Sequence, residues 1–193
     1  MAEPLVGRRA VFLDRDGTIV HDPGFLHDPA AVRLLAGAGG AIRRLNDAGW
    51  LVVTISNQSG IARGLYTAAD YQAVQRRLEA LLATDGARID AAFFCPHHPE
   101  VSGPCDCRKP GTKLFEDARR ALGIDFARSW FVGDRPSDVA PARTLHGRGL
   151  LVLTGQGASH RNAAEALDIP EIADLAAAVD LVVAGGTASQ ITA

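Results

Sequence analysis

The chain has 193 residues, of which 47% are hydrophobic and 22% charged, and this composition indicates a globular protein with one hydrophobic core of ordinary size. With 20 Lys and Arg against 22 Asp and Glu, the net charge is −2, so neither a nucleic-acid-binding nor a membrane-binding surface is expected. The N-terminus shows no basic segment followed by a long apolar run, and no apolar stretch reaches about 18 residues, so we expect a cytoplasmic protein without a secretion signal or a membrane span.

Short apolar segments alternate along the chain with longer amphipathic segments. We predict strands at 10–13, 51–55, 89–94, 130–132, 150–153 and 181–183, and helices at 37–48, 67–82, 112–122, from 136 onward, and at 172–178. Thr67, with Asp70 three residues later, is typical of a helix start, and Gly123 is typical of a helix end. This alternation predicts an α/β fold of parallel βαβ units, with helices on both faces of the sheet.

We expect a single domain over 1–193, with a core over about 8–184 and a flexible C-terminal tail. No insertion is long enough to form a separate cap domain. A site at the strand ends would therefore be open, and short loops such as 21–29 would select its ligand.

Two carboxylates follow the first predicted strand. Asp14 and Asp16 come directly after the apolar segment 10–13, and Gly17 permits the chain to turn there. In open parallel sheets, ligands bind just beyond the carboxyl ends of the strands. Two neighbouring carboxylates repel each other unless a cation balances them, and Mg²⁺ prefers carboxylate and phosphate oxygens. One carboxylate could then attack phosphorus while the other transfers a proton; the alternative is an acidic turn without chemistry.

The pattern Asp-x-Asp-Gly-Thr after an apolar strand resembles the first motif of the haloacid-dehalogenase-like (HAD-like) phosphohydrolases. The resemblance implies a three-layer, Rossmann-like fold with a mainly parallel sheet. It also implies that Asp14 is the nucleophile and that Asp16 is the acid/base that serves the ester oxygen.

The second predicted strand runs into Ser56-Asn57-Gln58-Ser59-Gly60. A hydroxyl and loop amides in this position can bind a phosphate, although a polar turn is the plain alternative. The resemblance makes Ser56 the hydroxyl that holds the transferring phosphoryl group, and Asn57 a further substrate contact. Arg63, on the same loop, could reach a second phosphate or be simply solvated.

Potential zinc ligands are concentrated in the loop 95–107, which holds all three cysteines of the chain: Cys95, Cys105 and Cys107, with His97 and His98 between them. Structural zinc takes four Cys or His ligands in a tetrahedron. Three cysteines and one histidine would leave no coordination position open, so we expect a structural Zn²⁺ rather than a catalytic one. The spacing allows either histidine, and the family pattern favours His97.

Arg108 and Lys109 follow the last cysteine directly, so a bound zinc ion would hold this basic pair in place. The resemblance makes Lys109 the lysine of the third motif, which neutralises the nucleophile and the phosphoryl oxygens. It makes Arg108 a substrate-binding residue.

The fourth predicted strand ends in Gly133-Asp134-Arg135-Pro136-Ser137-Asp138, which matches the fourth family motif, Gly-Asp-x-x-x-Asp. The resemblance implies a Mg²⁺ ion bound by Asp134, Asp14 and the main-chain carbonyl of Asp16. Asp138 would orient Lys109 or the waters of the metal. Arg135 would contact the substrate.

The zinc loop narrows the resemblance to a small branch without a cap domain, which includes heptose bisphosphate and histidinol-phosphate phosphatases. The resemblance implies a Mg²⁺-dependent phosphatase that removes one phosphate from a sugar bisphosphate, D-glycero-D-manno-heptose 1,7-bisphosphate, through an aspartyl-phosphate intermediate, on the way to nucleotide-activated heptose for lipopolysaccharide. Histidinol phosphate is an alternative substrate, and a catalytically idle, zinc-stabilised phosphate sensor is an alternative of another class. The expected partner is the small-molecule sugar phosphate alone, and we expect a monomer.

Overall fold

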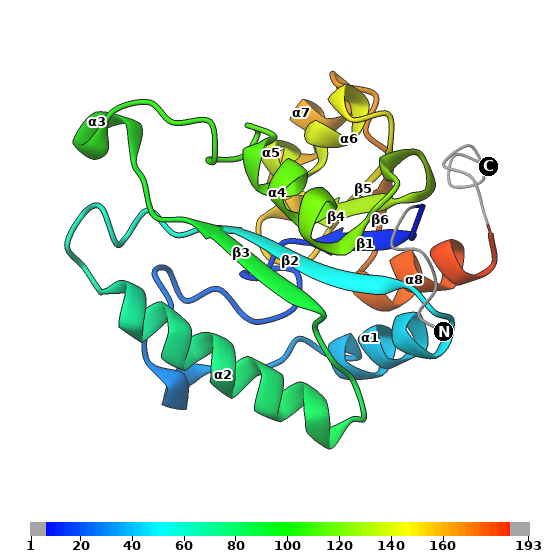
Figure 1. The fold of residues 1–193 in the computed structure, drawn as a ribbon, viewed down its shortest axis with the longest axis horizontal. Helices are drawn as coiled ribbons and strands as arrows, with labels where there is room; N and C mark the ends of the chain where they lie inside the picture. Colours follow the sequence, from blue (N-terminus) through cyan, green and yellow to red (C-terminus); the bar gives the residue numbers. More distant parts are fainter. Residues whose placement is uncertain (1–6, 186–193) are drawn as a thin grey trace.

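The computed structural model describes residues 7–185, in which strands and helices alternate as shown in Figure 1. The strands are β1 (Ala10–Leu13), β2 (Leu51–Asn57), β3 (Ala91–Cys95), β4 (Trp130–Gly133), β5 (Arg148–Val152) and β6 (Glu171–Ile172). The helices are α1 (Ala38–Asp47), α2 (Ala68–Thr84), α3 (Pro99–Ser102), α4 (Lys113–Leu122), α5 (Pro136–Val139), α6 (Pro141–Thr144), α7 (Arg161–Glu165) and α8 (Leu175–Val183). Three short 3₁₀ helices are η1 (Pro29–Ala31), η2 (Phe126–Arg128) and η3 (Gly157–His160). Within the described range, no helix has the length and apolarity needed to span a bilayer.

The six strands form one parallel sheet in the order β3-β2-β1-β4-β5-β6, which confirms the predicted α/β class. The central strand β1 lies between β2 and β4, with Leu13 level with Thr54 on one side and Val132 on the other. Because the three strands run in the same direction and in register, their carboxyl ends meet at one edge. The residues that follow these strands are therefore brought together by the topology.

Both faces of the sheet are covered, since successive side chains of β1 point to opposite sides. Val11 and Leu13 belong to a core shared with α1, α2 and α8, whereas Ala10 and Phe12 belong to a second core shared with α4 and η2. Figure 1 shows α1, α2 and α8 on one side of the sheet and α4 to α7 on the other. The fold is therefore three-layered, and between residues 7 and 185 no insertion forms a separate cap domain.

The predicted start of the second long helix is confirmed. The Thr67 hydroxyl accepts a hydrogen bond from the Asp70 amide, and the Asp70 carboxylate accepts one from the Thr67 amide, so two N–H groups at the start of α2 are satisfied. At the end of α4, Gly123 adopts a left-handed conformation with φ of 68°, as predicted for a glycine at this position.

The C-terminal elements differ from the prediction. Where we predicted a helix at 172–178 and a strand at 181–183, the structure has β6 at Glu171–Ile172 and α8 at Leu175–Val183. The Asp174 carboxylate caps the first turn of α8 by accepting a main-chain hydrogen bond of 2.9 Å. The helix buries one apolar side, formed by Leu175, Ala178, Val179 and Val182. A short apolar run fits a buried strand and a buried helix equally well, which explains the error.

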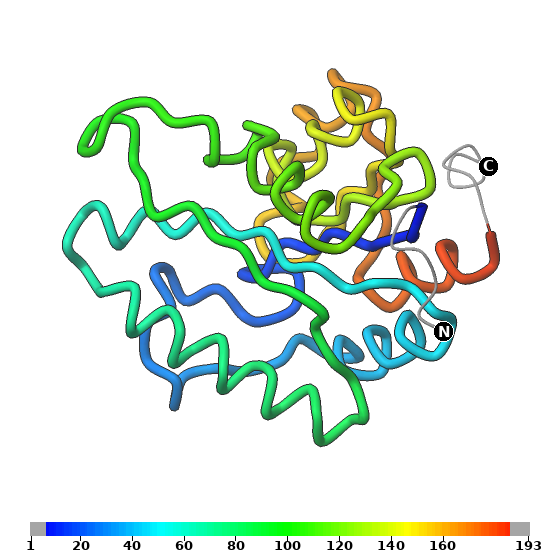
Figure 2. Tube along the Cα trace, viewed as in Figure 1, coloured from blue at the N-terminus to red at the C-terminus, as the bar shows by residue number. Residues whose placement is uncertain are grey.

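The segment between β3 and α4 extends beyond the end of the sheet before it returns to α4, as the green part of the trace in Figure 2 shows. This segment contains α3 and three of the predicted zinc ligands, and the fourth, Cys95, is the last residue of β3. Beyond Gly185, the predicted flexible tail lies outside the described residues.

Candidate active site

Lys109 forms the centre of a buried charged cluster at the carboxyl edge of the sheet. Its Nζ atom donates to Asp14 Oδ1 at 2.6 Å, to Asp138 Oδ1 at 2.8 Å and to the Ile55 carbonyl at 2.5 Å. These three bonds use all the donors of an ammonium group. Burial by itself lowers the pKa of Lys109, but the Asp138 and Asp14 carboxylates outweigh burial and raise it. Lys109 is therefore a fixed cation directly beside Asp14.

Asp134 lies next to this cluster and is itself fully buried. Two glycines with positive φ, Gly17 and Gly155, pack on its carboxylate. If either residue had a side chain, its Cβ atom would lie only 2.2 Å (residue 17) or 2.3 Å (residue 155) from Asp134 Oδ2. The Gln156 amide donates to Oδ2 at 2.8 Å, whereas the buried Oδ1 has no hydrogen-bond partner. A buried carboxylate oxygen without a donor is costly, which indicates a ligand position.

The residues at this edge fit a divalent cation with oxygen ligands. Carboxylate oxygens of Asp14, Asp134 and Asp138 lie within 4.8 Å of one another, and Lys109 pairs with Asp14 and Asp138. Burial raises the pKa of Asp14 to about 8 and that of Asp134 to about 6, because a single cation does not compensate three buried acids. A Mg²⁺ ion would supply the missing positive charge and a partner for Asp134 Oδ1.

Asp16 lies in the same pocket as Asp14, but different groups hold it. Arg15 donates from Nε to Asp16 Oδ1 at 3.0 Å and from Nη2 to Oδ2 at 2.9 Å, and Gln58 Nε2 donates to Oδ2 at 2.9 Å. The side chain of Arg15 is fully buried, with its guanidinium 5.0 Å from the centre of the Tyr71 ring. Sequence reasoning did not single out Arg15 or Gln58. The position of Arg15 between the two motif acids was the available signal for it.

Ser56 and Asn57, predicted to contact the substrate, have protein partners. Ser56 is buried, and its Oγ accepts a hydrogen bond from Gln58 Nε2, so its own proton is available to another group. The Asn57 side chain donates to the Lys109 carbonyl at 3.1 Å and accepts from the Lys109 amide at 3.0 Å. Asn57 therefore anchors the main chain that carries Lys109, in addition to lining the pocket.

The pocket itself has a volume of about 500 Å³ and contains both signs of charge. Asp14, Asp16 and Lys109 line it, together with Arg63, Arg108 and Arg135. The guanidinium of Arg135 lies 3.7 Å from Asp22, and Arg63 lies 2.7 Å from His98 and 5.8 Å from the centre of the Phe25 ring. Side chains from the loop 21–29, from the loop after β2 and from the zinc loop thus meet around one opening.

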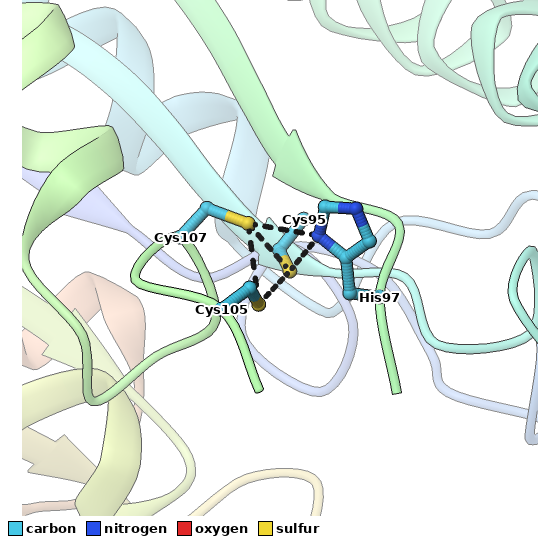
Figure 3. Close-up of side chains that lie close together, drawn as sticks. All are labelled: Cys95, His97, Cys105 and Cys107. Atoms are coloured by element: carbon cyan, nitrogen blue, oxygen red, sulfur yellow. Dashed lines mark hydrogen bonds between the residues drawn. The ribbon is translucent and has the colours of Figure 1, made fainter. Parts of the chain in front are cut away.

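The three cysteines and His97 converge in a second cluster, shown in Figure 3. The sulfur atoms of Cys95, Cys105 and Cys107 lie 3.0 to 3.7 Å apart, and His97 Nδ1 lies 3.2 Å from Cys107 Sγ and 3.8 Å from Cys95 Sγ. A tetrahedral zinc ion with Zn–S bonds of about 2.3 Å separates its ligand sulfurs by roughly 3.7 Å. His98 turns away to Arg63, so the geometry places His97 with the thiols.

The chemistry of this donor set also fits zinc. Burial raises the pKa of Cys95 to about 12 and also raises that of Cys107, so these two thiols keep their protons unless a metal displaces them, whereas hydrogen bonds lower the pKa of Cys105. Thiolates are the preferred ligands of Zn²⁺, and four protein ligands leave no position for a substrate. The cluster is therefore suited to hold the loop that carries Arg108 and Lys109, rather than to catalyse a reaction.

Replacing Cys105 with Ser is expected to reduce bound zinc well below one ion per chain and to lower the free energy of unfolding by several kcal/mol, since a structural zinc contributes its binding energy to folding. The loosened loop should also lower kcat on the order of 10-fold or more, because Lys109 loses its support. Metal analysis and thermal unfolding check both effects. His98→Gln, in the same loop but outside the cluster, is the matched control and should retain zinc. Full zinc content and unchanged unfolding in Cys105→Ser would contradict the assignment.

The chain is similar in sequence and structure to known proteins. The Hydrolase_like family, described as HAD-hydrolase-like, matches residues 106–178. A D-glycero-beta-D-manno-heptose-1,7-bisphosphate 7-phosphatase from Haemophilus ducreyi is 41% identical over 144 residues, which cover 72% of this chain and 79% of the relative. A D-glycero-D-manno-heptose-1,7-bisphosphate 7-phosphatase from Thermosynechococcus vestitus is 41% identical over 187 residues, which cover 90% and 94%.

Among solved structures, the D,D-heptose 1,7-bisphosphate phosphatase from B. bronchiseptica, complexed with magnesium and phosphate, superimposes with a TM-score of 0.82 at 34% identity, covering 93% of this chain and 99% of that one. This chain therefore belongs to the D,D-heptose 1,7-bisphosphate phosphatase family of HAD-like hydrolases.

Proposed function

We propose that the protein hydrolyses the 7-phosphate of D-glycero-D-manno-heptose 1,7-bisphosphate and releases the heptose monophosphate for synthesis of nucleotide-activated heptose. The observation that carries this proposal is the pairing of Asp14 with Lys109 in a pocket that three arginines also line. A carboxylate beside a fixed cation can approach a phosphate dianion, and arginine side chains bind phosphate oxygens through paired N–H donors. The names of the relatives support the choice of sugar.

In the first step, an Asp14 oxygen attacks phosphorus as the bond to the sugar oxygen breaks, and Asp16 gives its proton to that leaving oxygen. The products of this step are the free sugar hydroxyl and an aspartyl-phosphate on Asp14. Lys109 and the Ser56 hydroxyl stabilise negative charge on the transferring oxygens. A Mg²⁺ ion held by Asp14, Asp134 and the main-chain carbonyl of Asp16 would supply further positive charge there.

In the second step, water attacks the aspartyl-phosphate, and Asp16, now ionised, accepts the proton of that water. The P–O bond to Asp14 breaks, phosphate leaves, and both aspartates return to their starting state. The pairing of Lys109 with Asp14 and Asp138 supports its role, because it fixes a positive charge beside the nucleophile.

Arg63, Arg108 and Arg135 are the groups that we assign to the phosphate that is not transferred. All three line the pocket, yet none is paired with Asp14 or Asp16. A bisphosphate therefore has one phosphate at Asp14 and positive charge for the other. The monomeric state and the cytoplasmic location stay predictions.

Phosphate release should be fastest with the heptose bisphosphate and should require Mg²⁺. We expect kcat/KM for D-glycero-D-manno-heptose 1,7-bisphosphate to exceed that for a sugar monophosphate or for histidinol phosphate by on the order of 10²-fold, because the monophosphates leave the arginines unpaired. Measuring phosphate release with all three compounds, with and without Mg²⁺, checks this. A preference for histidinol phosphate would contradict the proposed substrate, and absence of Mg²⁺-dependent release would favour a phosphate sensor.

A further inference from the structure

Gln58 connects two groups of the proposed reaction that are not otherwise bonded to each other. Its Nε2 atom donates to Asp16 Oδ2 at 2.9 Å and to Ser56 Oγ, and its Oε1 atom accepts from the Tyr66 hydroxyl at 2.6 Å. The side chain is 2% exposed. Both N–H donors and one acceptor of the amide are therefore used inside the protein.

The partners decide which way the amide faces. The Asp16 Oδ2 atom already accepts a hydrogen bond from Arg15, and an oxygen that accepts in this way needs a donor beside it, so the amide atom facing it is the nitrogen. The oxygen then faces Tyr66, which must donate. Burial raises the pKa of Tyr66 to about 12, so the phenol keeps its proton at neutral pH.

Tyr66 is itself held in place by its surroundings. A Cβ atom at residue 60 would lie 2.1 Å from Tyr66 Cε1, so the ring packs directly on the main chain at Gly60. The His27 ring is stacked with the Tyr66 ring at a centroid distance of 5.9 Å. The loop that follows β2 thus folds back, so that Tyr66 fixes the orientation of the Gln58 amide through its hydrogen bond to Oε1.

Asp16 is left with one defined position for its proton. A carboxylate oxygen has two lone-pair sites. Oδ2 accepts from both Arg15 and Gln58, whereas Oδ1 accepts only from Arg15 among residues 7–185. The open site on Oδ1 is therefore the position from which a proton can pass to the ester oxygen.

From this geometry we infer that Gln58, oriented by Tyr66, is a positioning residue for proton transfer by Asp16 and for the phosphate-binding hydroxyl of Ser56. The inference rests on the proposed function and adds to it a residue that does not touch the reacting atoms. Without the Gln58 donor, Oδ2 has an open lone-pair site, and the proton is no longer confined to Oδ1. The Ser56 hydroxyl is then also free to rotate.

Esters that differ in their leaving group separate this role from a general loss of structure. A sugar alkoxide leaves only when Asp16 delivers a proton, whereas p-nitrophenolate leaves without one. The value of kcat/KM covers the steps up to formation of the aspartyl-phosphate. The ratio of kcat/KM for heptose bisphosphate to that for p-nitrophenyl phosphate therefore measures proton delivery. Loss of folded protein lowers both values by the same factor and leaves this ratio unchanged.

The test compares Gln58→Met with Gln75→Met, both with zinc and Mg²⁺ bound. Gln75 is also a buried glutamine, 4% exposed, but its Nε2 donates to Glu79 at 3.0 Å on the outer helix α2. We expect the ratio to fall on the order of 10-fold in Gln58→Met and to stay unchanged in Gln75→Met. Tyr66→Phe keeps the ring but removes the donor to Oε1, and it should lower the ratio by a smaller factor.

A parallel loss with both esters in Gln58→Met would overturn its role in proton transfer by Asp16, and no loss with either ester would overturn both of its roles. An unchanged ratio in Tyr66→Phe would overturn the orienting role of Tyr66. The proposed function is tested on the unaltered protein, and the role of Gln58 is tested on the variants, so the two proposals can fail separately. If the unaltered protein hydrolyses neither ester, both proposals are wrong.

Discussion

Replacing Asp14 with Asn is expected to lower kcat by on the order of 10³-fold or more, because the amide cannot form the aspartyl-phosphate. The fold should remain intact. Burial raises the pKa of Asp14 to about 8, so the charged form is unfavourable in the metal-free protein, and Lys109 still pairs with Asp138 in the variant. The metal-free variant should therefore unfold at a temperature no lower than that of the unaltered protein. Phosphate release and thermal unfolding check the two expectations.

Asp47→Asn is the matched control for this variant. Asp47 lies at the exposed end of α1, where it pairs with Arg43 at 3.7 Å, so kcat should be unchanged. Mass spectrometry of acid-quenched reactions should detect a phosphate adduct on the unaltered protein and none on Asp14→Asn. Near-normal kcat in Asp14→Asn would show that another group is the nucleophile.

Lys109→Met is expected to impair both activity and stability. Removing the ammonium takes away the positive charge beside the transferring oxygens, which lowers kcat by on the order of 10²- to 10³-fold. It also leaves Asp14 and Asp138 without their shared counter-charge in a buried site. Breaking a buried ion pair in this way costs about 3–5 kcal/mol, which for a chain of this size lowers Tm by roughly 10 °C or more.

Lys113→Met provides the comparison, since it removes the same side chain from the surface. Lys113 pairs with Asp117 at 2.9 Å on the exposed side of α4, and such pairs contribute at most about 1 kcal/mol. Bound zinc should be measured in both variants, so that an effect through the zinc loop is recognised. Equal changes in Tm for the two variants would show that Lys109 does not compensate buried charge.

The sequence pattern predicted most elements of the sheet because buried parallel strands are short, apolar and bounded by polar turns. Strand β1 was predicted with its observed bounds, and the capping box at Thr67 was predicted from two residues. The error at α8 has the same physical origin as the correct strand predictions. An apolar run indicates a buried segment, and burial alone does not distinguish a strand from a helix. The cap at Asp174 was the local signal that distinguished them.

By itself, the sequence determined the class of fold, the family and the residue types of both metal clusters. The acids of the motifs come directly after apolar strands, where they can be recognised in the sequence, and the choice of metal ligands depends on side-chain chemistry. Tertiary structure decided the contacts between residues that are far apart in the chain. It placed Asp138 on Lys109, closed Asn57 on the main chain of Lys109, set His97 rather than His98 among the thiols, and joined Gln58 to Asp16. Such contacts depend on strand order and register, which bring together side chains whose separation in sequence carries no signal of their distance in space.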